Sequence, residues 1–192
     1  MSDSTSPEAL LAHPQPARSG RTGLVLVHTG PGKGKTTAAL GLAFRALGWG
    51  WKILMIQFIK GSWKTGEKRL ADALSLPFEI LPMGGGCELE DTDRAASKAK
   101  CVEAWRIAET ILQDDEHDLV ILDEINIAMA HDHLDPTAVT AVIRKRPRWK
   151  SVVITGRRAP PPIIELADLV TEFTEVKHPF RQGVKAQKGI EF

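Results

Sequence analysis

The stretch at residues 28–37, HTGPGKGKTT, decides the fold and is a shortened form of a phosphate-binding loop. The usual pattern is G-x-x-x-x-G-K-[ST], but only three residues separate Gly30 from Gly34 here, and Thr29 stands where the first glycine is expected. Glycines in such a loop let consecutive backbone N–H groups turn toward one anion, and the following helix presents its positive end to the same anion. The alternative is a glycine-rich turn with surface lysines.

The segments on either side of the loop favour phosphate binding. Residues 24–27 are a short β-branched run that predicts a strand, and apolar side chains recur at helical spacing from Lys35 to Gly48. Strand, loop and helix in this order are the context in which the motif binds phosphate. In that context Lys33 and Lys35 supply positive charge, and the hydroxyl of Thr36 is a ligand for Mg²⁺.

Beyond this region the chain alternates apolar strands with helices. Residues 101–112 have the clearest helical spacing, and residues 119–124, LVILDE, are an apolar run that ends in two carboxylates. Because the strands are continuously apolar, helices should cover both faces of their sheet. Further strands are predicted at residues 52–58, 78–81, 151–157 and 169–176.

We therefore predict one α/β domain of the P-loop NTPase-like (RecA-like) type, with a mainly parallel sheet flanked by helices. It spans residues 22–192. A chain of 192 residues with 43% hydrophobic side chains is long enough for one domain with a substantial core. Residues 1–21 are rich in Ser, Pro and Ala and lack sustained periodicity, so we predict a flexible N-terminal arm there.

Charge and cysteine content exclude several classes of partner. The net charge is +1, from 25 basic and 24 acidic residues, so nothing global attracts the chain to nucleic acid or to an anionic membrane. Cys87 and Cys101 form no C-x-x-C motif, and the sequence has neither an apolar run of membrane-spanning length nor a signal-peptide core. We expect a cytoplasmic protein that binds neither nucleic acid nor membrane.

A candidate magnesium site lies at the end of the run at residues 119–124. Asp123 and Glu124 could reach a Mg²⁺ held at the loop, although a carboxylate pair at a strand end could also cap the next helix. Arg157 ends the strand at residues 151–157 on the same edge of the sheet, where ligands of open α/β folds bind. Arg157 could contact a phosphate group or form a surface ion pair.

Weaker signals come from histidines and tryptophans. The HDH triplet at residues 131–133 has a spacing that could bind metal, but a solvated turn is the better interpretation. Trp49, Trp51 and Trp149 are interpreted as packing residues, whereas Trp63 sits in a loop beyond a strand's carboxyl end and could face a ligand.

The chain resembles the ATP:corrinoid adenosyltransferase family from about residue 23 to residue 192. The resemblance rests on HTGPGKGKTTAALGLAFRALGWG, IQFIKGSWKTGE, LVILDE, VVITGR and the ending VKHPFRQGVKAQKGIEF. It implies an enzyme, usually a homodimer, that transfers the 5′-deoxyadenosyl group of ATP to the cobalt(I) of cobyrinic acid a,c-diamide, cobinamide or cobalamin and releases triphosphate. It also implies that ATP lies reversed in the shortened loop, which leaves its C5′ carbon open to attack.

The resemblance also implies roles for single residues. Triphosphate and catalytic contacts fall to Lys33 and Lys35, with Arg157 and His178 as positioning groups. Without the resemblance, His178 reads as an ordinary loop histidine and Arg45 as a solvated helix residue. Nucleotide or corrinoid contacts are predicted for Gly30, Pro31, Gly32, Lys33, Gly34, Lys35, Thr36, Thr37, Arg45, Trp63, Cys87 and Leu89, and the resemblance itself implies those from Gly30 to Thr36 and that of Arg45. The resemblance implies magnesium contacts for Thr36 and Glu124, and the position of Asp123 at the strand end adds it as a third candidate.

One segment departs from the family pattern. Relatives carry an aromatic pair, G-F-T-W, that packs below the corrin ring and removes the lower ligand of cobalt, whereas this chain has Cys87 and Leu89. Cobalt(II) without that ligand is easier to reduce, so the departure puts the efficiency of the reductive step in doubt. An electron-donating reductase is an expected partner for that step.

Two other functions stay open from the sequence. One is a different P-loop enzyme, such as a nucleoside kinase or an ATPase, which would release ADP. The other is a sensor or carrier that binds ATP and corrinoid without turnover.

Overall fold

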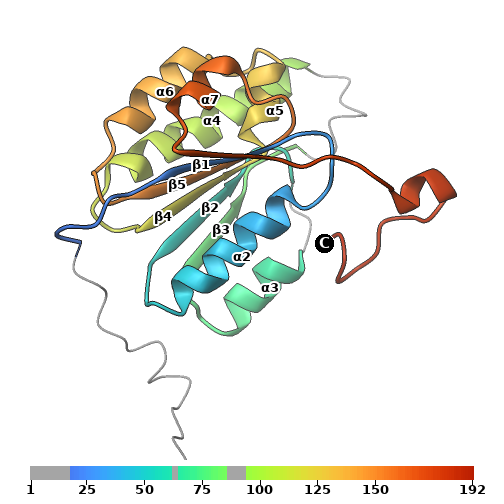
Figure 1. Ribbon diagram of the computed structural model, residues 1–192, viewed down its shortest axis with the longest axis horizontal. Coiled ribbons are helices and arrows are strands. Elements are labelled where there is room, and N and C mark those ends of the chain that lie inside the picture. Colours follow the sequence, from blue (N-terminus) through green and yellow to red (C-terminus); the bar gives the residue numbers. More distant parts are fainter. Residues whose placement is uncertain (1–17, 62–64, 86–93) are drawn as a thin grey trace, which may run out of the picture.

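In the computed structural model, residues 18–61, 65–85 and 94–192 are described, and they form one six-stranded sheet with helices on both faces (Figure 1). Three residues of the predicted site, Trp63, Cys87 and Leu89, lie outside these ranges. The strand order is β3-β2-β4-β5-β1-β6, and every pairing is parallel. The predicted α/β fold with a parallel sheet is therefore confirmed.

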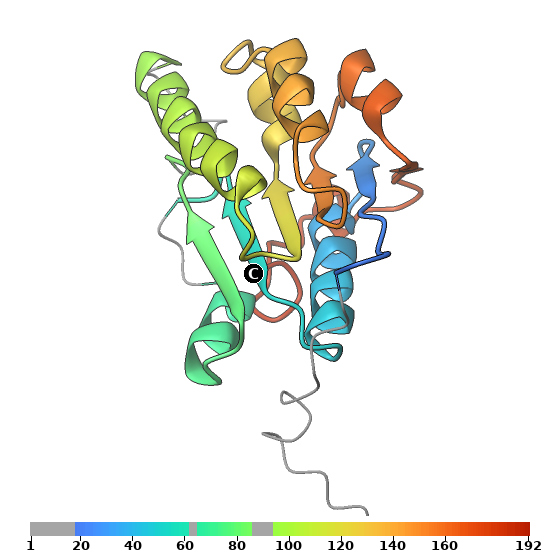
Figure 2. The same cartoon turned by 90° about the vertical axis from the view of Figure 1, so that its left-hand side faces the viewer.

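The strands begin and end close to the predicted positions. They are β1 (Val25–Thr29), β2 (Ile53–Gln57), β3 (Phe78–Pro82), β4 (Leu119–Asp123), β5 (Ser151–Thr155) and β6 (Leu169–Glu172). β2, β4 and β5 are buried at all five positions, as the continuous apolar runs predicted. Figure 2 shows that the strands run in one direction, so their carboxyl ends share one edge of the sheet.

The last strand is shorter than predicted and lies at the edge of the sheet. It was expected over residues 169–176, but β6 ends at Glu172 and all four of its residues are exposed. Beyond it, the backbone N–H of Phe173 donates to Thr29, and the carbonyl of Phe173 accepts from Gly32. The chain therefore leaves the sheet to follow the glycine loop.

Two groups of helices cover the sheet. α2 (Lys35–Leu47) and α3 (Gly66–Ala73) lie on one face, and the other face carries four helices (Figure 1). Those four are α4 (Arg94–Gln113), α5 (Ile125–Ala130), α6 (Pro136–Arg144) and α7 (Pro161–Leu166). Each face has its own cluster of buried apolar side chains, so both sides of the sheet are core. A short 3₁₀ helix, η2 (Pro179–Gln182), follows in the C-terminal segment. None of the helices in the described residues is both long enough and apolar enough to span a bilayer.

One tryptophan was assigned wrongly from the sequence. Trp49 was interpreted as a packing residue, but it is 64% exposed, and its neighbour on α2, Phe44, is 77% exposed. Both lie at the end of α2, where the chain turns through Gly48 and Gly50, and their side chains stay outside the core.

The described chain is tied to the amino edge of the sheet at its start. Arg18 and Arg21 both bond to the buried carboxylate of Asp118, at 3.1 and 2.6 Å. The Arg18 guanidinium also lies 4.0 Å from the ring centroid of Trp149, and that of Arg21 lies 4.1 Å from the centroid of Trp51. Residues 18–21 are thus anchored on the side of the sheet opposite to the glycine loop.

A fully buried lysine joins α4 to β5. Lys150 donates to the carbonyl and the carboxylate of Asp114, each at 2.7 Å. Burial alone would raise the pKa of the Asp114 carboxyl, but hydrogen bonds from Lys150 and His117 outweigh it and lower the pKa to about 2. Because this pKa lies below the ordinary value, the ionised carboxylate stabilises the folded state.

We expect Asp114→Asn to lower the free energy of unfolding by about 2 kcal/mol at pH 7. A lowered folded-state pKa gives stability that is present above the unfolded pKa near 4 and is lost as the pH falls toward 2. Urea unfolding of both proteins between pH 7 and pH 2.5 should therefore show a difference that narrows with acid. Asp72→Asn, which removes an exposed helix ion pair with Lys68, is the control and should cost under about 0.5 kcal/mol. A difference independent of pH would contradict this account of Asp114.

Candidate nucleotide-binding and catalytic site

The glycine loop connects the carboxyl end of β1 to the amino end of α2. Gly30 and Gly34 both adopt left-handed backbone angles, with φ of 94° and 109°. Between them, the N–H of Gly32 donates to the carbonyl of Phe173 at 2.7 Å. The loop therefore lies against the segment that follows β6 as well as at the start of a helix.

Close packing against that segment explains why the loop needs glycine. A Cβ on Gly30 would lie 2.5 Å from the carbonyl oxygen of Phe173, and one on Gly32 would lie 2.6 Å from that of Thr174. Both contacts are with backbone atoms, which cannot move aside as a side chain can. The glycines thus serve the fold as well as any phosphate, which the motif alone did not indicate.

Both lysines of the loop are bonded within the protein. Lys35 is buried and donates from Nζ to the carbonyls of Gly30 and Gly32, at 2.8 and 2.6 Å. Burial lowers the pKa of Lys35, and the charge of Glu124 opposes that shift. Lys33 forms an ion pair with Glu191, near the end of the chain. The positive charges predicted to hold phosphate are present at the loop, each with a partner that a ligand would have to replace.

Asp123 is the polar centre of the site. Its carboxylate is fully buried and accepts hydrogen bonds from the hydroxyls of Thr36 and Thr155, both at 2.8 Å, and from the amide of Gln57 at 3.3 Å. The Nζ of Lys60 lies 3.7 Å from the Oδ2 of Asp123. The structure therefore brings Thr36 and Asp123 together, as the sequence predicted.

Glu124 holds an oxygen atom that no described residue satisfies. Its Oε2 is buried without a hydrogen-bond partner, and its backbone is left-handed, with φ of 63°. Burial and the nearby charge of Asp123 raise the pKa of Glu124 to about 7. Although Glu124 occupies the N-cap position of α5, its side chain makes no capping bond, so helix capping does not explain this carboxylate.

These oxygen atoms suit a magnesium ion. Mg²⁺ prefers hard oxygen ligands and is usually bound by one or two carboxylates together with substrate phosphates. The unpartnered oxygen of Glu124 beside Asp123 and the hydroxyl of Thr36 provides that donor set.

Arg157 follows the carboxyl end of β5 and is exposed. Its positive charge contributes to lowering the pKa of both Lys35 and Glu124. It forms no ion pair with any residue that the structure describes, and its role at the site stays a prediction.

Two residues of the predicted site lie elsewhere in the chain. Arg45 is exposed in the last turn of α2, ten residues and therefore about 15 Å along the helix from Lys35. His178 accepts a hydrogen bond from the N–H of Phe180 at 3.1 Å and caps η2, the short red helix that projects to the right in Figure 1. Within one chain, neither residue is beside the loop.

The HDH triplet is a turn with one buried member. His131 and Asp132 are exposed, but His133 is 5% exposed, with Nδ1 3.6 Å from Cys101 Sγ. A fully solvated turn was therefore wrong for His133.

Three residues of the site were missed from the sequence. Thr155 ends the strand next to β4, so a polar residue at the end of a buried run was an available signal. Gln57 holds the same position on β2. Glu191 carried no signal, because its segment has no periodicity that places it in space.

Comparisons with known proteins agree on one family. The model of a family described as "ATP:corrinoid adenosyltransferase BtuR/CobO/CobP" matches residues 21–192. A corrinoid adenosyltransferase of Pseudomonas aeruginosa is 46% identical over 170 residues, which cover 88% of this chain and 84% of the relative. One of Escherichia coli (strain K12) is 43% identical, over 88% and 86% of the two chains.

Among solved structures, the flagellar accessory protein FlaH of Methanocaldococcus jannaschii has a similar fold. Its TM-score is 0.54 at 13% identity, over 79% of this chain and 71% of that one. At this identity the likeness concerns the fold alone.

We expect Gly30→Ala to lower the free energy of unfolding by at least about 2 kcal/mol, because the new Cβ meets the Phe173 backbone and φ is strained. Gly41→Ala is the matched control. Gly41 is exposed within α2, a Cβ there meets nothing within 4 Å, and alanine should add about 0.5–1 kcal/mol. Urea denaturation measures both, and equal effects would show that the loop is not crowded in solution.

Proposed function

The chain belongs to the ATP:corrinoid adenosyltransferase family, and from this premise we propose how its residues carry out the reaction. The enzyme transfers the 5′-deoxyadenosyl group of ATP to the cobalt(I) of a corrinoid and releases triphosphate. One observation supports the proposal above all. Where the end of β4 meets the start of α2, the structure brings together Lys35, Thr36, Asp123 and Glu124.

The glycine loop holds the triphosphate in this proposal. Lys35 turns from the carbonyls of Gly30 and Gly32 to phosphate oxygens, and Lys33 exchanges Glu191 for phosphate. Each exchange replaces a neutral or singly charged partner by a polyanion, which favours the bound state. Positive charge fixed at the loop is worth most where negative charge grows during the reaction, which is on the departing triphosphate.

Thr36, Asp123 and Glu124 would hold Mg²⁺. The ion would supply further positive charge to the phosphates. The bonds from Thr155 and Gln57 fix the carboxylate of Asp123, and the unbonded oxygen of Glu124 would be available to the ion. Arg157 adds a cation that no described residue neutralises.

The shortened loop supports a reversed nucleotide. Transfer to cobalt requires the nucleophile to approach C5′ in line with the departing oxygen, so the sugar must face outward and the triphosphate inward. With one residue fewer between its glycines, the loop encloses less of the phosphate chain. No general base is required, because the cobalt(I) nucleophile carries no proton.

Other features of the enzyme follow from the family resemblance alone. We propose a cytoplasmic homodimer that receives electrons from a reductase, and we propose that Trp63, Cys87 and Leu89 border the corrinoid. His178 and Arg45 remain predicted substrate contacts, and neither lies beside the loop of its own chain.

The test is a product analysis. Purified protein, Mg-ATP and chemically reduced cob(I)alamin should give adenosylcobalamin and triphosphate in equal amounts, without ADP. Release of ADP would indicate a kinase or ATPase instead, and tight corrinoid binding without product would indicate a carrier.

The same assay tests the loop lysine. Lys35→Met should lower kcat/KM by about 100-fold or more, because it removes a fixed charge at the triphosphate. Lys145→Met is the control, since Lys145 is exposed at the end of α6 on the other face of the sheet and should keep full activity. Normal turnover of Lys35→Met would contradict the assignment of this loop to triphosphate.

The pair of Lys33 and Glu191 gives a separate prediction. Glu191→Gln removes the carboxylate that competes with phosphate for Lys33, so the Kd for Mg-ATP should fall by about threefold at low salt. The gain should shrink at about 0.5 M salt, because Lys33 is half-exposed and screened. Calorimetric titration measures both values. Glu175→Gln, which removes the pair with Arg181 in the same segment, is the control and should leave Kd unchanged.

A further inference from the structure

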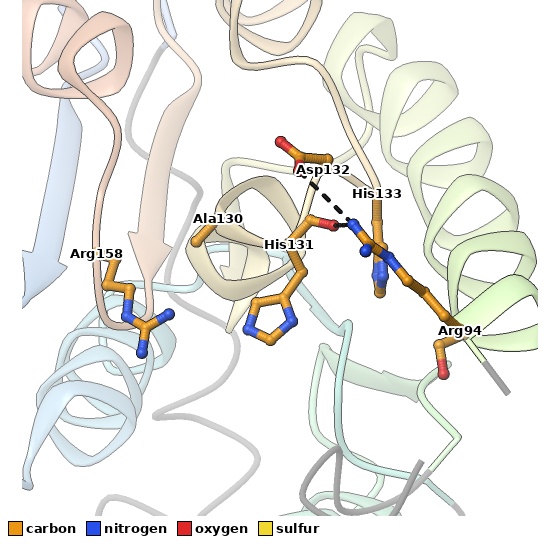
Figure 3. A pocket seen from close by; sticks show the side chains of 7 residues that line it. Arg94, Ala130, His131, Asp132, His133 and Arg158 are labelled. Atoms are coloured by element: carbon orange, nitrogen blue, oxygen red, sulfur yellow. Dashed lines mark hydrogen bonds and ion pairs between the residues drawn. The ribbon is translucent and has the colours of Figure 1, made fainter. Parts of the chain in front are cut away.

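A cavity lies at the carboxyl edge of the sheet beyond the proposed ATP site. Its volume is about 350 Å³, and its walls come from the first described turn of α4, the end of α5 and the loop after β5. Figure 3 shows Arg94 and Arg158 on opposite sides of the end of α5, with the ring of His131 between them. The proposed mechanism uses none of these three side chains.

The charges of the described residues that line the cavity do not cancel. Arg94 donates to the carbonyl of His131 at 3.0 Å and lies 3.6 Å from the carboxylate of Asp132, so its charge has a partner. Arg158 forms neither a hydrogen bond nor an ion pair with any residue in the described ranges. Among the residues that the structure describes, the cavity therefore presents one guanidinium without a charged partner, together with an imidazole, and this combination suits an anionic oxygen group.

The loop that carries Arg158 is fixed in place. Gly156 and Arg158 have positive φ angles of 127° and 59°. The carbonyl of Gly156 accepts from the amide of Asn126 at 3.1 Å, and the N–H of Ala159 donates to the hydroxyl of Thr29 at 3.2 Å. The backbone at Arg158 is thus held between bonds to α5 and to β1, so the point from which its side chain extends is set by the fold.

The cavity lies within reach of a substrate that reacts at the ATP site. It lies at the far end of α5, a six-residue helix that starts directly after Glu124, hence about 9 Å from that residue. On the other side, Arg158 follows Arg157, whose charge acts on Lys35 and Glu124. A corrinoid carries its acid or amide side chains on the rim of the macrocycle, away from the reacting cobalt.

We propose that this cavity binds an anionic group of the corrinoid substrate, with Arg158 as the main contact, His131 as a second donor, and Arg94 holding the turn that presents His131. This inference rests on the proposed function. The shared chemistry is an anionic oxygen, which a corrinoid can supply as a free carboxylate on the rim or as the phosphodiester of its nucleotide loop. The cavity thereby sets which corrinoids the enzyme prefers.

Three corrinoids separate the two sources. Cobyrinic acid a,c-diamide has free rim carboxylates and no phosphate, cobalamin has the phosphodiester and no free carboxylate, and cobinamide has neither. We expect Arg158→Gln to raise the KM of the a,c-diamide by about tenfold at saturating Mg-ATP, and to leave the KM values of cobinamide and ATP within about twofold. A rise for cobalamin instead would assign the cavity to the phosphodiester and would still support an anion site.

Two further variants distinguish a direct contact between Arg158 and the substrate from a purely structural role of Arg158. Arg158→Lys keeps the charge and should recover most of the loss, whereas a residue needed only for its packing would not be rescued by charge. Arg148→Gln is the matched control, because Arg148 is exposed before β5 at the opposite edge of the sheet and should change no KM. An equal rise of KM for all three corrinoids, or no rise for either anionic one, would overturn the proposal.

Failure of the reaction itself is recognised separately. Turnover of cobinamide by the unaltered protein establishes the transferase reaction without any anionic group on the substrate. If no corrinoid is turned over, the proposed function fails, and equilibrium dialysis of the same three corrinoids still tests the cavity. A Kd that Arg158→Gln raises only for an anionic corrinoid would support the site, and a Kd that stays unchanged for all three would reject it.

Discussion

The buried carboxylate of Asp123 is the constraint on which the rest of the site depends. It stands at the end of β4 and bonds to Thr36 on α2, Thr155 on β5 and Gln57 on β2. A charge removed from water is costly unless it is fully hydrogen-bonded, so these partners cannot be lost singly. The carboxylate therefore fixes the start of α2, and with it the glycine loop, against three neighbouring strands at their carboxyl ends.

This arrangement also explains the unusual state of the next residue. With Asp123 directed inward, the chain must turn at once into α5, and Glu124 makes that turn in a left-handed conformation. Its backbone N–H is held by Thr155, and its side chain keeps one buried oxygen unbonded. Two adjacent carboxylates thus have different roles, one organising the fold and one left available to a ligand.

Much of this could be predicted from local sequence. The burial of β4 could be predicted because its residues are apolar up to the final aspartate. The closeness of Thr36 and Asp123 could be predicted because the carboxyl ends of parallel strands share one edge of the sheet. The contacts of Phe173 with the loop and of Glu191 with Lys33 could not be predicted, because they join residues far apart in sequence through segments without periodicity. His133 is buried against Cys101, which lies on a separate helix. The local sequence around His133 does not predict this contact. The position of Arg45, by contrast, follows from helix geometry once α2 is given, and the family resemblance alone had linked it to the site.

The strained turn at Glu124 has a consequence for attempts to make the enzyme more thermostable. Glycine or asparagine adopts a left-handed backbone at less cost, and either would remove a buried acid that is poorly satisfied in the absence of a ligand. A laboratory selection for heat resistance alone would therefore drift toward Glu124→Gly or Glu124→Asn, while a selection for turnover would keep glutamate. At this position, thermal stability and catalytic activity favour different residues.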